Sequence, residues 1–243
     1  MIRTNFNRTD MKPRFHPDLI AVLLILMLFL SAGAASSAIT ARQTLEKASR
    51  NYEIINDYTV DAQLNIDSPD IQIPKTKVKI YYKKPDKVHV ESRDGLAILP
   101  RNGLFTGNPL KNFMSADELL ITGSTIIDGR DCYVISASFI KDDRPVETKV
   151  WIDKKDWLVM RISANPGFGP SVDVSLKYSK VEGKYWLPVY TKAKLTIPPM
   201  KHGHGNFKPG PPKPSIAIIR FSNYHVNKGI KDSVFIEKPE RGN

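Results

Sequence analysis

The chain has 243 residues, of which 41% are hydrophobic and 25% are charged, and its formal net charge at pH 7 is +11. This length suits one domain, or one domain with an appendage. Cys132 is the only cysteine, which excludes an internal disulfide, and we expect it to be a small buried apolar residue.

The first 38 residues have the order of a secretory signal peptide. The apolar run from Leu19 to Leu30 would form about 18 Å of helix, whereas the hydrocarbon core of a bilayer is roughly 30 Å thick. Basic residues precede this run, and small residues that suit cleavage after Ala34 or Ala38 follow it. We therefore expect a cleaved leader over residues 1–38, a mature domain over 39–243 and a periplasmic location.

The two alternatives to a cleaved leader are an uncleaved membrane anchor and a lipidated N-terminus. An uncleaved inner-membrane anchor would have to borrow Ser31 to Ile39 to reach full length. The stretch Leu30-Ser31-Ala32-Gly33 is close to a bacterial lipobox, but glycine stands where the lipidated cysteine is required, so a thioether lipid is excluded. For an exported chain nucleic acid is not an expected partner. The positive charge favours an anionic membrane surface, lipopolysaccharide or an acidic protein, unless the lysines only form a solvated face.

The first predicted element after the leader is an amphipathic helix over Thr40 to Ile55. Its apolar residues recur at helical spacing, at Ala41, Leu45, Ala48, Tyr52 and Ile55. Thr40 and Gln43 have the spacing of a capping box at its start.

From Tyr58 onward, apolar and polar residues alternate with a period of two, which is typical of strands with one buried face. Tyr58 to Ile66 forms the first such run. Lys77 to Lys83 and Val88 to Glu91 form the next two, and the turn residues Pro85-Asp86 between them indicate a hairpin. Turn residues then recur between β-rich runs, which favours a meander of antiparallel strands.

Two segments interrupt this alternation. Pro109 to Ile121 is predicted to be a short second helix, because Ser115 and Glu118 have capping-box spacing. Its apolar side would hold Phe113, Met114, Leu119 and Leu120. Pro198 to Pro214 contains six prolines and three glycines and is predicted to be a loop. His202 and His204 lie in this loop, but two histidines without a third ligand are weak evidence, and we expect no metal site.

These elements predict a mainly β fold. About nine strands of eight residues give a sheet face on the order of 1,100 Å², whereas two short helices cover about 400 Å² of it. Because large exposed apolar patches are rare, we expect the sheet to curl around the helices as an open or closed antiparallel barrel of about nine to eleven strands. The pattern leaves open whether this barrel is filled with side chains or hollow.

The apolar members of the alternating runs are the candidates for the wall of a ligand cavity. They are Val78, Ile80, Tyr82, Val88, Val90, Val150, Ile152, Ile216 and Ile218. A one-residue error in register would place any of these sets on the outer face.

Several segments of this chain resemble the LolA/LolB-like superfamily of periplasmic outer-membrane lipoprotein carriers and related lipid-binding proteins. They are the leader, the amphipathic helix, YYKKPDKVHVES, VETKVWIDKKDWLVMRI, GKYWLPVYTKAKL and FSNYHVNKGIKDSVF. The resemblance implies an incomplete curved antiparallel β-barrel wrapped over an N-terminal helix and a short inner helix, whose inner wall holds acyl chains during transfer between membranes. It also implies membrane-associated donor and acceptor proteins as partners. The arginine that locks the lid of the true carrier is not assigned among Arg42, Arg50 and Arg93.

Enzyme motifs are absent from the sequence, which has no G-x-S-x-G elbow, no phosphate-binding P-loop and no H-E-x-x-H pair. Asp142, Asp143, Asp153 and Asp156 lie at predicted hairpin turns, where aspartate is favoured by local hydrogen bonding. We therefore expect no catalysis and no cofactor. The predicted function is that of a soluble periplasmic carrier, which holds acyl chains of a lipoprotein or lipid in an apolar cavity for transfer toward the outer membrane. The alternative is a protein-binding envelope factor with the same fold and no transported lipid.

Overall fold

The computed structural model describes residues 39–69, 74–92, 107–141, 144–166, 170–197 and 214–236. These residues belong to one compact unit, Ile39–Asn243. The predicted leader, Arg93, the pair Asp142 and Asp143, and the proline-rich loop except Pro214 lie outside the described residues. Within the described part, no helix combines the length and the apolar character that a membrane crossing requires.

The predicted amphipathic helix is confirmed as α2 (Ala41–Glu53), and it begins with the predicted capping box. The Thr40 hydroxyl accepts a hydrogen bond from the Gln43 amide (3.2 Å), and the Thr40 amide donates to the Gln43 side chain (3.0 Å). These two bonds satisfy amides that the first turn of a helix leaves without an internal partner. The helix buries mostly small side chains, namely Ala41, Thr44, Leu45, Ala48 and Ser49.

Ten strands form one antiparallel sheet in the order β3-β2-β1-β10-β9-β8-β7-β6-β5-β4. The strands are β1 (Asp57–Asp67), β2 (Thr76–Lys83), β3 (Lys87–Ser92), β4 (Glu118–Ile127), β5 (Arg130–Lys141), β6 (Arg144–Asp153), β7 (Val159–Ala164), β8 (Ser171–Val181), β9 (Tyr185–Thr196) and β10 (Ser215–Val226). The predicted meander is confirmed from β4 to β10, where each strand pairs with the next. The pairing of β1 with β10 then joins the N-terminal hairpin strands to this meander.

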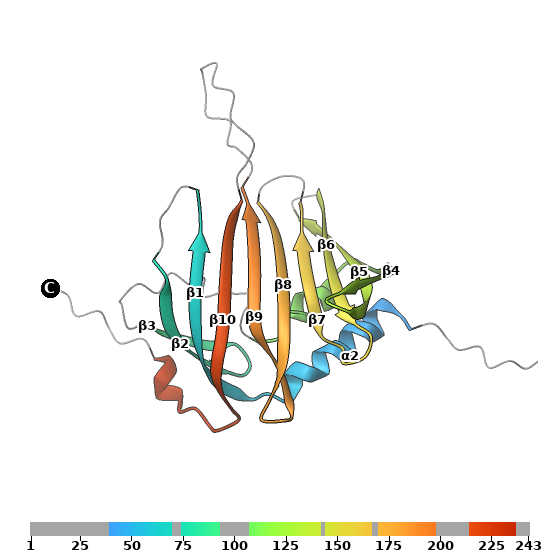
Figure 1. Ribbon diagram of the computed structural model, residues 1–243. Helices are drawn as coiled ribbons and strands as arrows, with labels where there is room; N and C mark the ends of the chain where they lie inside the picture. The colour runs from blue at the N-terminus through green and yellow to red at the C-terminus, as the bar shows by residue number, and fades with distance from the viewer. Residues whose placement is uncertain are drawn as a thin grey trace, which may run out of the picture. The chain divides into compact units, whose positions relative to one another are not determined.

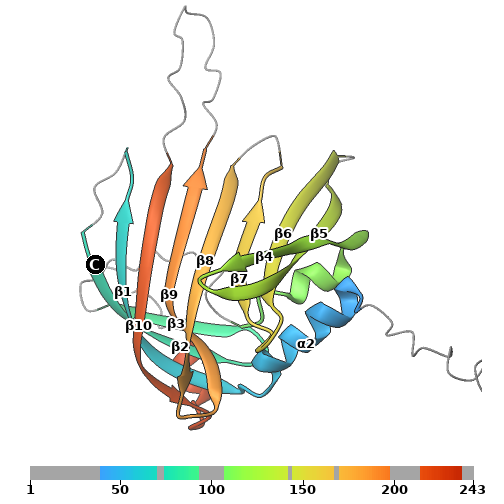
Figure 2. The same ribbon diagram turned by 45° about the vertical axis from the view of Figure 1, so that its right-hand side comes forward.

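The sheet is strongly curved and open, with β3 and β4 as its two edges. Figures 1 and 2 show that α2 lies across one side of this curved sheet, near the lower ends of β6, β7 and β8. A 3-10 helix, η1 (Lys111–Ser115), lies on the same side, and a second one, η2 (Asp232–Phe235), follows β10. The predicted mainly β fold, an incomplete curved antiparallel barrel over an N-terminal helix, is thus confirmed.

The short helix predicted over Pro109 to Ile121 is present only as a 3-10 helix near its start, and its predicted extent and capping box are wrong. Only η1 is helical there, Ser115 ends it without capping, and the Ser115 hydroxyl donates to the carbonyl of Asn112 instead (2.9 Å). The remaining residues enter strand β4, because Leu119 and Ile121 alternate with the exposed Leu120 and pair with strand β5. A period of two therefore overrides the capping-box spacing in this segment.

Candidate functional site

An apolar ladder crosses the inner face of the sheet, which is the face that carries α2. It is made of directly paired residues on neighbouring strands, Ile135, Val150, Ile162, Val174, Ala193, Ala217 and Ile66. Alternate residues of each strand point to opposite faces, so the period-two pattern of the sequence concentrates apolar side chains on this one. This inner face is the candidate site.

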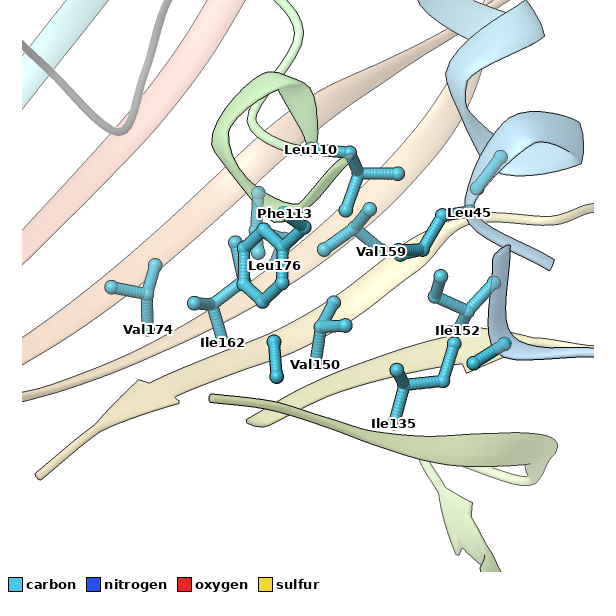
Figure 3. Close-up of a cluster of buried hydrophobic side chains, with 13 residues drawn as sticks. Leu45, Leu110, Phe113, Ile135, Val150, Ile152, Val159, Ile162, Val174 and Leu176 are labelled. Carbon is cyan, nitrogen blue, oxygen red and sulfur yellow. The ribbon is translucent and has the colours of Figure 1, made fainter. Parts of the chain in front are cut away.

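Over strands β5 to β8 the inner face is closely covered. Figure 3 shows Leu45 of α2, together with Leu110 and Phe113 of the segment around η1, facing side chains such as Val150 and Ile152. Leu45 and Leu110 are fully buried, as are the two strand residues. This half of the face is therefore filled with side chains.

A second buried cluster covers the other half of the inner face, over β1, β2, β9 and β10. Its strand residues include Val60, Leu64, Val78, Ile80 and Ile219, all of which are buried. The two clusters meet at a seam on this continuous sheet.

Tyrosines gather near this seam. The ring centroids of Tyr58 and Tyr82 are 5.1 Å apart, and those of Tyr58 and Tyr224 are 5.7 Å apart. The hydroxyls of Tyr52, on α2, and Tyr178, on β8, are hydrogen-bonded at 3.0 Å. The Tyr224 hydroxyl donates to the carbonyl of Pro188 at 2.7 Å.

Burial keeps these phenols neutral. It raises the pKa of Tyr52 to about 12 and raises the pKa of Tyr58, Tyr178 and Tyr224 above the usual value for tyrosine. A buried phenolate loses its hydration, which is the largest cause of each shift. The seam therefore presents apolar rings with a few uncharged hydroxyls.

A small cavity of about 30 Å³ opens at this seam. Among its lining residues are Tyr52, Tyr58, Tyr82, Leu176 and Tyr178. This volume is roughly that of one water molecule in the liquid. Pockets that enclose a drug-sized ligand measure about 300–1,000 Å³, so this cavity by itself has no room for an acyl chain.

Polar contacts hold α2 in place at several points. The Asn51 side chain donates to the carbonyls of Asp156 (2.9 Å) and Trp157 (3.1 Å) in the turn between β6 and β7. The Lys47 ammonium lies 4.5 Å from the centre of the Trp157 ring. Near the start of the helix, Arg42 Nη1 lies 3.4 Å from the carbonyl oxygen of Met114. The two Asn51 bonds are partly buried and the Arg42 contact is exposed, so each contributes a moderate amount to holding the helix.

The structure brings most of the sequence-predicted site residues to the inner face. Val78, Ile80 and Tyr82 are buried in the cluster over β1 and β2, and Val150 and Ile152 are buried beneath α2. Val88 and Val90, on edge strand β3, are half-buried and pack against the first of these groups.

Ile216 and Ile218 differ from the expected placement and lie on the outer face. Their neighbours Ile219 and Ala217 take the inward positions, since Ile219 pairs with the buried Leu64. Ile218 instead pairs with Lys192 on β9. The physical reason is that four consecutive apolar residues in β10 satisfy either alternation equally well.

Sequence reasoning did not single out Tyr178, Leu110 or Phe113 as lining residues. The alternation of Val172, Val174, Leu176 and Tyr178 along β8 would have predicted Tyr178 as an inward-facing residue. His202 and His204 lie outside the described residues. Among the residues that the structure does describe, no three potential ligands form a group suited to a metal ion.

Comparisons by sequence find no matching family model and no matching curated protein. Comparison with solved structures finds the same fold. The LolA superfamily protein of Nitrosomonas europaea aligns with a TM-score of 0.53 and 12% identity, over 82% of this chain and 99% of that one. A DUF1329 family protein from Desulfovibrio piger aligns with a TM-score of 0.52 and 15% identity, over 81% and 97%. The described residues thus have a LolA-like fold.

Proposed function

We propose that this protein is a soluble periplasmic carrier that holds the acyl chains of a lipoprotein or lipid against the inner face of its sheet and delivers them toward the outer membrane. The observation that carries the proposal is the apolar inner face, half of which is covered by α2, whose buried side is mostly small residues, and by Leu110 and Phe113 around η1. The LolA-like fold supports it. Export by the leader, membrane-associated donor and acceptor proteins, and the absence of catalysis belong to the same proposal.

Acyl chains enter at this cavity only if its cover moves, because its volume of about 30 Å³ is too small for them. The helix α2 is the movable cover. Its one large, fully buried side chain is Leu45, and burial of a leucine contributes about 1.5–3 kcal/mol. Ala41 and Ala48 add roughly 0.8 kcal/mol for each methyl group.

Burial of an acyl chain on the inner face is the source of energy that would compete with the packing of α2. A sixteen-carbon acyl chain gains roughly 0.8 kcal/mol per buried CH₂, or on the order of 10 kcal/mol before the costs of binding. That gross gain is larger than the burial terms of Leu45, Ala41 and Ala48, to which the packed ring of Tyr52 and the polar contacts of Asn51 and Lys47 add. Acyl chains can therefore replace α2 on the ladder of inner-face residues, and the helix can return when they leave.

Purification without detergent tests this function. We expect the chain, expressed in a Gram-negative host, to carry extractable lipid that mass spectrometry detects, and to bind a fluorescent sixteen-carbon fatty acid stoichiometrically. A matched pair on β10 separates the two faces: Ala217→Asp on the inner face is expected to weaken probe binding, and Ile216→Asp on the outer face is not. Both variants must keep a cooperative melting transition. A well-folded wild type that takes up neither probe nor lipid would contradict the proposal.

The second candidate function is a protein-binding envelope factor with the same fold. The filling of the inner face by side chains favours it, since a filled face needs no cargo for stability. In the same experiment this candidate requires a lipid-free, folded protein that binds a protein partner.

A further inference from the structure

The outer face of the sheet carries a groove that plays no part in the proposed carrier function. It has a volume of about 420 Å³ and crosses strands β7, β8 and β9. Most of its lining is polar, and includes Arg161, Ser163, Asp173, Ser175, Lys192 and Lys194. We call it the outer groove.

The register of the strands explains the hollow. Arg161, Ser175 and Lys192 lie directly opposite one another on the three strands, and Ser163, Asp173 and Lys194 form the next such row. Each row combines a serine with longer side chains. The short side chains of Ser163 and Ser175 form the floor of the groove, and the longer arginine, lysine and aspartate side chains form its walls.

The guanidinium group of Arg161, at one side of the groove, is held by several contacts. The Arg161 Nε donates to both carboxylate oxygens of Asp173 at 3.0 Å, and its Nη2 also donates to Asp173. The guanidinium lies 4.7 Å from the centre of the Trp151 ring. Its third nitrogen, Nη1, makes no hydrogen bond within the described residues, and so remains available to a ligand.

Two lysines of the groove have no counter-ion among the described residues. Asp173 lies directly opposite Lys194, but its carboxylate pairs with Arg161. Neither Lys192 nor Lys194 forms an ion pair anywhere in the described part of the chain. Two residues apart on one strand, their Cα atoms are about 7 Å apart on the same face. A doubly charged anion placed between them relieves the repulsion of the two ammonium groups.

Hydroxyl groups accompany these charges. The side chains of Ser163, Ser175 and Thr196 line the groove and form no hydrogen bond to any described residue. Unpaired hydroxyls can both donate to and accept from the hydroxyls of a ligand. The groove therefore combines a site for an anion with partners for a polyol.

We propose that the outer groove binds a phosphorylated polyol, with the phosphate between Lys192 and Lys194 and the polyol hydroxyls on the serine floor. This chemistry occurs both in free polyol phosphates and in lipid head groups. Ile216 and Ile218 on β10 pair with Lys194 and Lys192 on β9, and they border the site with apolar surface. The binding is independent of the inner face, because these side chains point away from it.

Calorimetric titration of the full chain with glycerol 3-phosphate at low ionic strength tests the proposal. We expect saturable binding at one site, and the double variant Lys192→Gln/Lys194→Gln to weaken it by at least roughly tenfold, since each lysine makes a charge-assisted contact. The matched control is Lys77→Gln/Lys79→Gln, which removes two exposed lysines of the same spacing from strand β2, outside the groove. This control is expected to change the affinity by less than about twofold.

A variant that keeps every charge separates the groove from the charge of the surface. Ser175→Val fills the floor and removes a hydroxyl, so it is expected to weaken binding while melting is retained. Vesicles of phosphatidylglycerol, compared with phosphatidylcholine, distinguish a head group from a free ligand, and binding to either source supports the site. Loss of affinity that is equal in the two lysine pairs, or binding unaffected by Ser175→Val, would overturn it. So would the absence of saturable binding to both glycerol 3-phosphate and phosphatidylglycerol vesicles.

Discussion

Replacing Leu45 by alanine is expected to tighten the binding of a fatty acid probe while destabilising the protein. Leu45 is the fully buried leucine of α2, and it packs among the inner-face residues beneath the helix. Buried Leu→Ala changes cost about 2–5 kcal/mol. In the closed form α2 lies on the sheet, and in the open form it is displaced. If about 2 kcal/mol of that loss falls on the closed form alone, the open form becomes roughly 30-fold more populated relative to the closed form. Apparent affinity rises by up to the same factor while the open form is the minor one.

Fluorescence titration with the probe and thermal unfolding, measured side by side, check this reasoning. The control is Leu158→Ala, which removes the same group from a buried leucine in a separate cluster with Cys132 and Met160. It is expected to lower the melting temperature comparably and to leave probe affinity unchanged. The idea that α2 is the movable cover is refuted if Leu45→Ala lowers the melting temperature without tightening binding, or if both variants tighten it equally.

Three further predictions concern other parts of the molecule. Osmotic shock of a Gram-negative host is expected to release the chain without its first 34 or 38 residues, as N-terminal sequencing would show; full-length protein found only in membranes would support an uncleaved anchor. Asp153→Ala is expected to cost about 1–3 kcal/mol in urea unfolding, because the buried Asp153 carboxylate accepts from Arg130 (3.1 Å) and from the Asp156 amide (2.6 Å); an unchanged midpoint would contradict this. Burial raises the pKa of Tyr52 from 10.0 to about 12, so its contribution to stability is full below pH 10 and is lost as the pH rises toward 12. Unfolding measured across that range, with Tyr52→Phe as the control, reports the loss.

Local patterns predicted the elements of this fold well. The helix over residues 40–55 carries both a periodic apolar face and a capping box, and two independent signals agree there. Strand β1 shows the expected alternation, with Tyr58, Val60, Ala62 and Leu64 all buried. Cys132 is buried as expected, and burial raises the pKa of its thiol to about 11, so it stays protonated at neutral pH.

Features that depend on partners far away in the sequence were not predictable in the same way. The sequence does not show which of the residues Ile216 to Ile219 in β10 point to the inner face. Only the pairing of Ile219 with Leu64 and Thr191 decides this. The outer groove arises from the register of three strands, so no single stretch of sequence reveals it. The seam between the two clusters is likewise a property of packing, which a sequence pattern does not encode.

The pairing of β1 with β10 also sets the order in which this protein can be completed. A chain that emerges N-terminus first presents β1, β2 and β3 long before β10, their link to the rest of the sheet, has appeared. Until then one edge of β1 is an unpaired template beside an uncovered apolar surface, a state prone to aggregation. Such distant pairing also slows folding, because a long loop must close before the contact forms. The sheet is thus complete only when β10 has been added. A chain cut short before Ser215 would leave the N-terminal strands without a sheet to join.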